Sequence, residues 1–343
     1  MKKLLNTLYV ISPDAYLSLS DGNIMITLPD DRKSFVPLHT LNSVVCFSHK
    51  GASPALMGYC AKNSIRMSFY SPTGAFLFAV DSEYSGNVLL RMGQFQISKD
   101  EEKSLPLARN MIIGKLYNEK FVLLRCVRDH ALRVNGEALR KSVDSIQHAM
   151  ESVRRVSSEE TLRGLEGNAA SAYFSVFDHM ILQNKDRFYF HERNRRPPLD
   201  RVNALLSFSY SLLANDCAGA LKSVGLDPYV GFMHALRPGR TSLALDLMEE
   251  LRPAFADRFV LTLINNRMIS ADDFEVRENE SVLLTDSGRK TFLNEWQKKK
   301  REEITHPFLN EKVSWGLVPF LQAQLLARTV RGDLDEYPSF FWK

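Results

Sequence analysis

Two separated stretches of the sequence combine a titratable side chain with small or turn-forming neighbours. In GLEGNAASAYFSVF, Glu166 lies between two glycines at the head of an apolar segment, so a large partner can approach it closely. In GLDPYVGFMHALRPGRTS, residues 225–242, the prolines predict a loop or short turn that presents His234. A single carboxylate performs no obvious chemistry, so Glu166 needs partners from elsewhere in the chain.

A third stretch, SLALDLMEELRP, predicts a helix that begins near residue 242 and that Pro253 can end. At about 100° per residue its leucines form an apolar arc, and Asp246, Glu249 and Glu250 fall together on the opposite side. Three acids on one helical face repel one another unless a cation or a basic partner offsets them. The residues alone leave open a metal ligand set and a solvated face answered by nearby arginines.

The three stretches together fit one chemistry. A glutamate, a histidine on a loop and an acid on a third element form a mixed oxygen and nitrogen site that suits Mg²⁺ or Mn²⁺. Such an ion polarises a phosphoryl oxygen and activates a hydroxyl or water for in-line attack. Two basic clusters, residues 193–201 and 287–301, are each typical of solvated surface, but together they favour a polyanionic partner such as nucleic acid.

The first ninety or so residues predict β-structure. Short β-branched or aromatic runs are separated by turn signals, among which Ser20-Asp21-Gly22-Asn23 predicts a hairpin and residues 71–74 a turn. The runs are LYVI, YLSLS, NIMITL, FVPL, SVVCF and RMSFYS. One helix interrupts them, with Ser53 as its N-cap and Pro54 at its first position.

From about residue 95 onward, long amphipathic segments predict helices, with Gly114, Gly136 and Gly225 marking helix ends. We therefore predict an α+β protein. A small β-rich domain spans residues 1–90, and a larger all-α catalytic domain spans residues 91–343.

The composition is that of an ordinary globular protein, with 343 residues, 45% hydrophobic and 24% charged. No apolar run approaches the roughly 18 residues needed to cross a bilayer, and the N-terminus shows no signal-peptide cleavage site. The four widely spaced cysteines predict buried thiols rather than a zinc site. We expect a cytoplasmic protein without membrane association.

Four motifs resemble those of one known family, the CRISPR adaptation integrase, the universal enzyme of spacer acquisition. They are EGNAASAYF, RRPPLDRVNALLSFSYSLL, GFMHALRPGRTSLALDLMEELRP and RGDLDEYPSFFWK. The resemblance covers essentially the whole chain and looks most similar to the subtype I-C branch. It implies an N-terminal β domain that pairs two subunits and a helical domain that holds a metal ion.

The resemblance also implies the site residues. The Glu of the family's EG-x-AA motif corresponds to Glu166, the His of its GF-x-H segment to His234, and the second acid of its D-L-x-E motif to Glu249. These three would bind Mg²⁺ or Mn²⁺, and the choice of Glu249 over Glu250 rests on the resemblance. Asp246 joins the candidate catalytic residues, because it could take a water of the ion, orient His234, or only continue the charge pattern.

Family members form homodimers, and two dimers bridge a dimer of a small ferredoxin-like adaptation protein around a double-stranded prespacer. The resemblance implies that a prespacer 3′-hydroxyl attacks a phosphodiester at the leader–repeat junction of the CRISPR array. A stand-alone nuclease on branched or single-stranded DNA and a non-catalytic DNA-binding scaffold are the alternatives. Candidate DNA contacts are Tyr173, Arg195, Arg196, Arg237 and Arg240.

Overall fold

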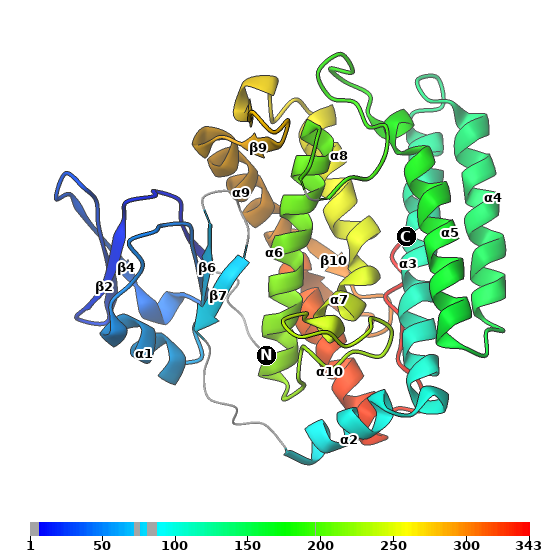
Figure 1. Ribbon diagram of the computed structural model, residues 1–343, viewed down its shortest axis with the longest axis horizontal. Coiled ribbons are helices and arrows are strands. Elements are labelled where there is room, and N and C mark those ends of the chain that lie inside the picture. Colours follow the sequence, from blue (N-terminus) through cyan, green and yellow to red (C-terminus); the bar gives the residue numbers. More distant parts are fainter. Residues whose placement is uncertain (1–6, 72–75, 81–87, 196) are drawn as a thin grey trace. The chain divides into compact units, whose positions relative to one another are not determined.

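The computed structural model describes residues 7–71, 76–80, 88–195 and 197–343 (Figure 1). The chain forms two compact units: the first is Met1–Ser85 with Leu284–Arg301, and the second is Gly86–Leu283 with Glu302–Lys343. The mixed α+β architecture, strand-rich at the N-terminus and largely helical afterwards, agrees with the sequence prediction. Helix α9 (Asp286–Arg301), which the sequence analysis assigns to the helical domain, belongs instead to the strand-rich unit.

The strand-rich unit contains a four-stranded sheet, ordered β1-β5-β6-β7, and a three-stranded antiparallel sheet, ordered β2-β3-β4. In the larger sheet only the β6–β7 pair is antiparallel. Helix α1 (Pro54–Lys62) packs against strands of both sheets and helps to enclose the core of this unit. The other elements are β1 (Thr7–Val10), β2 (Tyr16–Ser20), β3 (Asn23–Thr27), β4 (Lys33–Pro37), η1 (Leu38–Thr40), β5 (Ser43–Cys46), β6 (Arg66–Tyr70) and β7 (Phe76–Val80).

Local signals placed most of these elements correctly. The hairpin is confirmed: Asp21 and Gly22 have φ angles of 46° and 74°, as a two-residue turn with both central residues left-handed requires. The helix start is also confirmed, because the Ser53 side chain accepts a 3.2 Å hydrogen bond from the Leu56 N–H. Strand β7 has no counterpart in the sequence prediction, and the turn expected at residues 71–74 lies almost wholly outside the described residues.

In the helical unit, α3 (Glu101–Asp129), α4 (Gly136–Val153) and α5 (Glu159–Ser175) pack side by side (Figure 1). Helix α6 (Arg201–Ser223) packs against α7 (Ser242–Glu249) and α10 (Val318–Arg331). The remaining elements of the chain are α2 (Val88–Ser98), η2 (Phe177–Met180), η3 (Arg252–Asp257), α8 (Arg258–Asn265), η4 (Ala271–Asp273), β8 (Phe274–Val276), β9 (Val282–Leu284), β10 (Glu303–Thr305), β11 (Lys312–Ser314) and η5 (Trp315–Leu317).

Two predicted helix ends are wrong: one glycine is there for packing, and one proline lies in a helical segment that continues. Gly114 lies inside α3, where an added Cβ would lie 3.0 Å from Glu250 Oε2 and 3.2 Å from Ser339 Cβ. Glycine is therefore needed there for close packing rather than for chain termination. Pro253 does not end a helix either, because it lies in η3, a π-helical segment that leads into α8.

The C-terminal segment, residues 332–343, runs beside α3 (Figure 1) and is fixed to it by Asn118. The buried Asn118 amide donates hydrogen bonds of 2.7 and 2.8 Å to the carbonyl oxygens of Glu250 and Phe340. Its carbonyl oxygen accepts a 2.9 Å hydrogen bond from the Trp342 N–H. One side chain thus joins α3, the end of α7 and the C-terminal segment.

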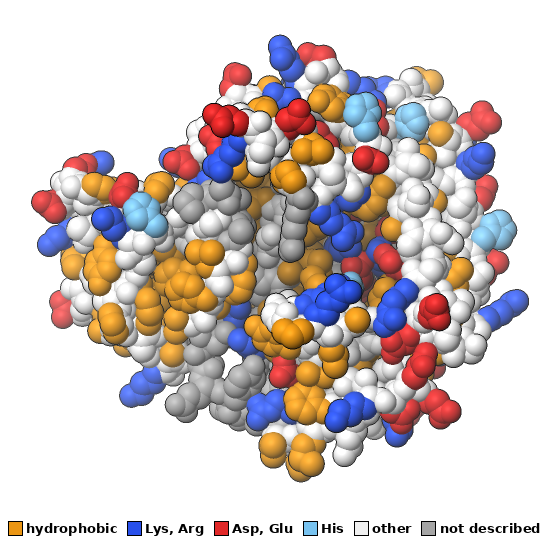
Figure 2. Space-filling view, viewed as in Figure 1, with side chains coloured by type: hydrophobic (Ala, Val, Ile, Leu, Met, Phe, Trp, Pro, Cys, Tyr) orange, Lys and Arg blue, Asp and Glu red, His pale blue; other side chains and the backbone are white. Residues whose placement is uncertain are grey.

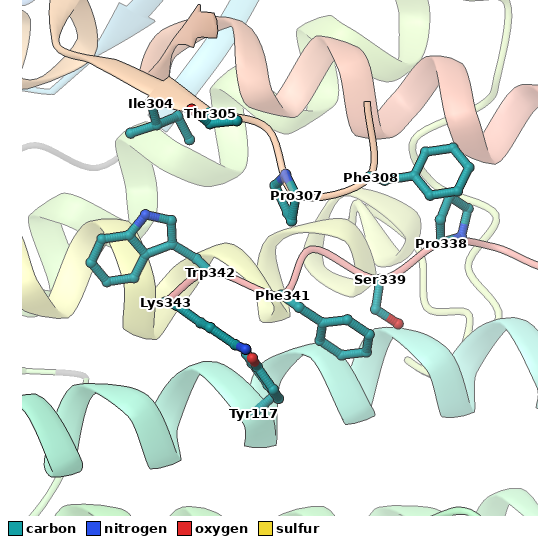
Figure 3. Close-up of a pocket in the computed structure, with 10 residues that line it drawn as sticks. All are labelled: Tyr117, Ile304, Thr305, Pro307, Phe308, Pro338, Ser339, Phe341, Trp342 and Lys343. Carbon is teal, nitrogen blue, oxygen red and sulfur yellow. The ribbon is translucent and has the colours of Figure 1, made fainter. Parts of the chain in front are cut away.

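The outer side of this segment lines a pocket that contains no carboxylate or imidazole side chain (Figure 3). Phe341 packs on Tyr117 of α3 with 4.7 Å between ring centroids, whereas Phe340 is turned into the core. The lining residues are Tyr117, Ile304, Thr305, Pro307, Phe308, Pro338, Ser339, Phe341, Trp342 and Lys343. None of the helices in the described ranges combines the length and hydrophobicity that a bilayer crossing requires.

We predict that Asn118→Ala lowers the free energy of unfolding by about 2–4 kcal/mol, because two buried carbonyl groups and one partly buried N–H group lose a hydrogen bond. The C-terminal segment should also become more accessible to limited proteolysis. Urea unfolding and a proteolysis time course measure both effects. The matched control is Asn168→Ala at an exposed position of α5, and equal stability of the two variants would contradict the prediction.

Candidate active site

A buried ammonium group joins two of the three predicted metal ligands. Lys115, in the middle of α3, pairs through Nζ with Glu166 Oε1 of α5 and, at 2.7 Å, with Glu249 Oε2 of α7. The Lys115 side chain is 3% exposed and that of Glu249 5% exposed. Because both carboxylates contact one nitrogen, their oxygens lie within roughly 6 Å of one another, twice a hydrogen-bond length.

The charges in this cluster stabilise one another. Burial disfavours the ammonium form of Lys115, but the Glu249 and Glu166 carboxylates outweigh it and raise the pKa of Lys115. Burial also raises the pKa of Glu249, yet Arg252 and Lys115 together lower it well below its usual range. Arg252 Nη1 lies 2.8 and 3.1 Å from the two Glu249 oxygens. Glu249 is therefore a fixed, fully charged carboxylate.

His234, the third predicted ligand, is held by Asp246. Asp246 Oδ1 lies 2.6 Å from His234 Nδ1, and the Asp246 side chain is wholly buried. Its two oxygens also accept hydrogen bonds from the backbone N–H groups of Phe232, Met233 and His234. With Nδ1 engaged by a carboxylate, Nε2 is the ring nitrogen left for a ligand. Among the alternatives for Asp246, the structure favours orientation of His234.

The loop that carries His234 has little freedom. Arg163 of α5 donates hydrogen bonds of 3.0 and 2.9 Å to the Met233 carbonyl oxygen, so the loop is tied to the Glu166 helix. At Gly231, an added Cβ would lie 2.6 Å from Asp246 Oδ2 and 2.9 Å from the Ser242 backbone. No other residue type fits between the loop and α7 without moving Asp246.

The three acids of α7 and its end do not form a solvated face, because all three are buried. Glu250 points away from Lys115 and accepts hydrogen bonds from the Tyr337 hydroxyl, from Gln322 Nε2 at 2.8 Å and from the Phe340 N–H at 2.8 Å. Burial raises the pKa of Glu250 to about 7 despite these donors. Glu250 therefore anchors the C-terminal segment, and Glu249 alone of the three faces Lys115.

Behind the cluster lies a second layer of buried polar groups, which no motif of the sequence predicts. Glu119, one helical turn after Lys115, is 1% exposed, and its Oε2 has no hydrogen-bond partner among the described residues. Burial raises the pKa of Glu119 to about 8, against the opposing effect of Lys115. Asp257 accepts a hydrogen bond from the Tyr210 hydroxyl, and burial raises its pKa as well.

The candidate DNA contacts are divided between surface and core. Arg195 and Arg237 are exposed, Arg240 is half-buried, and Arg196 lies outside the described residues. Figure 2 shows Lys and Arg side chains gathered over the region of the α6–α7 loop. Tyr173 is a different case: its side chain is wholly buried and packs against Phe174 and Phe177. The structure therefore contradicts a DNA contact by Tyr173, which is a packing residue of the core.

The arrangement fits a divalent cation in its donor chemistry. Two carboxylates from different helices face one cation, the Lys115 ammonium, and an imidazole near enough to lower the pKa of Glu249 offers its free nitrogen. Such oxygen and nitrogen donors suit Mg²⁺ or Mn²⁺. In the described ranges, no three His, Cys, Asp or Glu side chains are close enough together to hold a metal as they stand. The Lys115 ammonium lies between the Glu166 and Glu249 carboxylates and contacts both of them.

Comparison with known proteins identifies the family. The family model described as "CRISPR associated protein Cas1" matches residues 8–298. The CRISPR-associated endonuclease Cas1 2 of Rhodospirillum rubrum is 48% identical over 347 residues, covering 100% of both chains. The chain belongs to the Cas1 family. The predicted resemblance is thereby confirmed at the level of the family, while subtype I-C stays a prediction.

The fold is also found in solved structures of more distant sequence. A casposase bound to an integration product has a TM-score of 0.85 at 22% identity, over 99% of this chain and 95% of that chain. A Cas6-RT-Cas1–Cas2 complex has a TM-score of 0.83 at 21% identity, over 100% of this chain and 36% of that chain. At these identities the likeness concerns the fold alone.

We predict that Gly231→Ala displaces Asp246 and with it His234, lowering both the melting temperature and the nuclease activity. The new methyl group cannot fit within 2.6 Å of a carboxylate oxygen. Differential scanning fluorimetry and a plasmid-nicking assay measure the two effects. The control is Gly58→Ala in α1, where nothing lies within 4 Å of an added Cβ and alanine favours the helix. Identical behaviour of the two variants would show that the loop tolerates the methyl group.

A second prediction concerns the pH dependence of stability. Since the folded chain keeps a proton on Glu119 up to a pH of about 8 and an unfolded glutamate loses it near its ordinary value, this group destabilises the fold by about 1.4 kcal/mol per unit of rising pH in that window. Glu119→Gln removes the effect, so the variant should gain stability over the unaltered protein from pH 5.5 to 7.5. Urea unfolding at three pH values tests this, with the exposed Glu102→Gln as control. A pH-independent difference would exclude a buried protonated Glu119.

Proposed function

We propose that this Cas1-family protein is a divalent-metal-dependent DNA endonuclease and integrase, which inserts prespacer DNA into a CRISPR array. The observation that carries the proposal is the meeting of Glu166 and Glu249 at one buried cation, beside an imidazole oriented by a buried carboxylate. Membership of a family of CRISPR-associated endonucleases and the similarity to a casposase bound to an integration product support it.

In this proposal Glu166, Glu249 and His234 Nε2 hold Mg²⁺ or Mn²⁺. When bound, the ion supplies charge stabilisation at a phosphoryl oxygen and lowers the pKa of an attacking hydroxyl or water. Asp246 keeps the imidazole of His234 oriented, and Arg252 keeps Glu249 ionised and in place. A DNA 3′-hydroxyl as nucleophile gives strand joining, and water gives cleavage.

The exposed surface around the α6–α7 loop is the proposed DNA contact. Arg237 and Arg240 lie on the same loop as His234, so phosphate contacts there would place the DNA backbone next to the site. Arg195 remains a further candidate from the basic stretch before α6. Open space above Gly164 and Gly167 of α5 supports close approach of DNA to the Glu166 helix.

We also propose a homodimer that works with a small ferredoxin-like partner, two dimers bridging one partner dimer around prespacer DNA. The support is the family resemblance, together with the presence of a Cas1–Cas2 complex among the similar solved structures. A cytoplasmic location belongs to the same set of proposals.

We predict that Glu166→Gln and His234→Ala reduce strand transfer by at least two orders of magnitude, or roughly 3 kcal/mol of barrier. The assay follows labelled prespacer joined to a supercoiled repeat plasmid on a gel, with and without EDTA. The matched control is Glu160→Gln, an exposed position on the same helix α5.

The three candidate functions give different results in this assay. Joined product that needs a divalent ion and is lost in both variants supports the integrase. Cleaved plasmid without joined product identifies a stand-alone nuclease. Unchanged products in Glu166→Gln and with EDTA identify a non-catalytic scaffold.

A further inference from the structure

Lys115 takes the place of a metal ion in the charge balance of the site. Its ammonium contacts both Glu166 and Glu249, which are the two carboxylates assigned to the divalent ion. Arg252 adds a second positive charge to Glu249. Two cations therefore already balance the two carboxylates without any divalent ion.

A divalent ion added to this arrangement would place two further positive charges beside the Lys115 and Arg252 cations. Uncompensated charge in a buried site is strongly unfavourable, and a lysine ammonium and a divalent ion cannot share the same carboxylate oxygens at close range. Arg252 is the less mobile of the two cations, because its guanidinium also lies 4.3 Å over the Tyr210 ring. Lys115 is therefore the cation that has to leave the carboxylates when a divalent ion binds.

Glu119 is placed to receive the Lys115 ammonium. It follows Lys115 by four residues on α3, so the two side chains emerge on the same face of the helix, one turn apart. The Glu119 carboxyl is 1% exposed, and its Oε2 has no hydrogen-bond partner in the described part of the chain. A buried carboxyl oxygen without a partner is rare and needs an explanation. An approaching ammonium favours its ionised form, so the proton that Glu119 carries near neutral pH would be released to solvent as the ammonium arrives.

We propose that Lys115 competes with the divalent ion for Glu166 and Glu249, and that Glu119 takes the displaced ammonium when the ion binds. Lys115 is then a positioning residue, which keeps the two carboxylates together before the ion arrives. Glu119 is the carboxylate that pairs with the Lys115 ammonium after the ion has displaced it from Glu166 and Glu249. This inference rests on the proposed metal-dependent function of the site.

The test is a Mn²⁺ titration of the full-length, metal-free protein, followed by the electron paramagnetic resonance signal of free Mn²⁺. In Lys115→Met the competitor is gone, so the dissociation constant should fall roughly tenfold or more. In Glu119→Gln the displaced ammonium has no anionic partner, so the dissociation constant should rise roughly threefold to tenfold. Lys120→Met is the matched control, because Lys120 lies on the same helix but pairs with Gln147 at 2.9 Å.

Melting temperatures add a second readout. Without metal, Lys115→Met should melt below the unaltered protein, and saturating Mn²⁺ should raise its melting temperature by more than it raises that of the unaltered protein. A lysine with a purely structural role predicts the reverse for affinity, since its loss would loosen the carboxylates and weaken Mn²⁺ binding.

The outcomes separate this inference from the function beneath it. If the unaltered protein binds Mn²⁺ and Glu166→Gln does not, the proposed metal site is supported. In that case, equal or weaker Mn²⁺ binding by Lys115→Met contradicts only the proposal that Lys115 competes with the ion. If the unaltered protein and Glu166→Gln are alike in showing no saturable binding, the proposed function itself fails. Should Lys115→Met not fold, Glu119→Gln decides, because unchanged affinity in that variant removes Glu119 as the acceptor.

Discussion

The contact of the Lys115 ammonium with Glu166 and Glu249 fixes the relative positions of three helices. Lys115 and Glu249 are buried and Glu166 is half-buried. Each charge would be costly without the others, so α3, α5 and α7 pack in an arrangement that satisfies all of them. Hydrophobic packing alone would accept small rotations of these helices. The ion pairs do not, and they therefore give the candidate site a defined geometry before any ligand is present.

Close packing also gives each of the three neighbouring acids its own role. Asp246, Glu249 and Glu250 are close in sequence, yet one orients His234, one faces Lys115 and one anchors the C-terminal segment. A helix with a solvated face would leave such residues free to exchange roles. Because α7 is enclosed on all sides, each carboxylate is held by its own donors. Removing one acid therefore cannot be compensated by the next.

The sequence was most informative where a signal is local. The strands, the hairpin at Asp21-Gly22 and the start of α1 follow from turn and capping chemistry, and the family resemblance follows from contiguous motifs. Lys115 and Glu119 were not predicted as part of the site, because their importance depends on contacts with segments that are distant in sequence. A signal was nevertheless present: both lie among the apolar positions of α3 that include Met111 and Val122, where a surface helix would place no charge. Gly114 was wrongly predicted to end a helix for a related reason, because glycine is needed there for the close approach of Glu250, which is distant in sequence.

The π-helical segment after α7, where the sequence predicts a helix end at Pro253, places Arg252 and Asp257 on one side of the chain. In an α-helix, residues five apart point about 140° away from each other, so Asp257 would leave the side of the helix that Arg252 occupies. In a π-helix the turn is wider, so residues five apart lie much nearer to the same face. The segment Arg252–Asp257 therefore lets Arg252, which is three residues after Glu249, and Asp257 remain on one buried side, where each shifts the pKa of the other. The wider turn of this segment extends the charged cluster from the partly exposed Glu166 into the core. The helix is not broken, because the segment continues directly into α8.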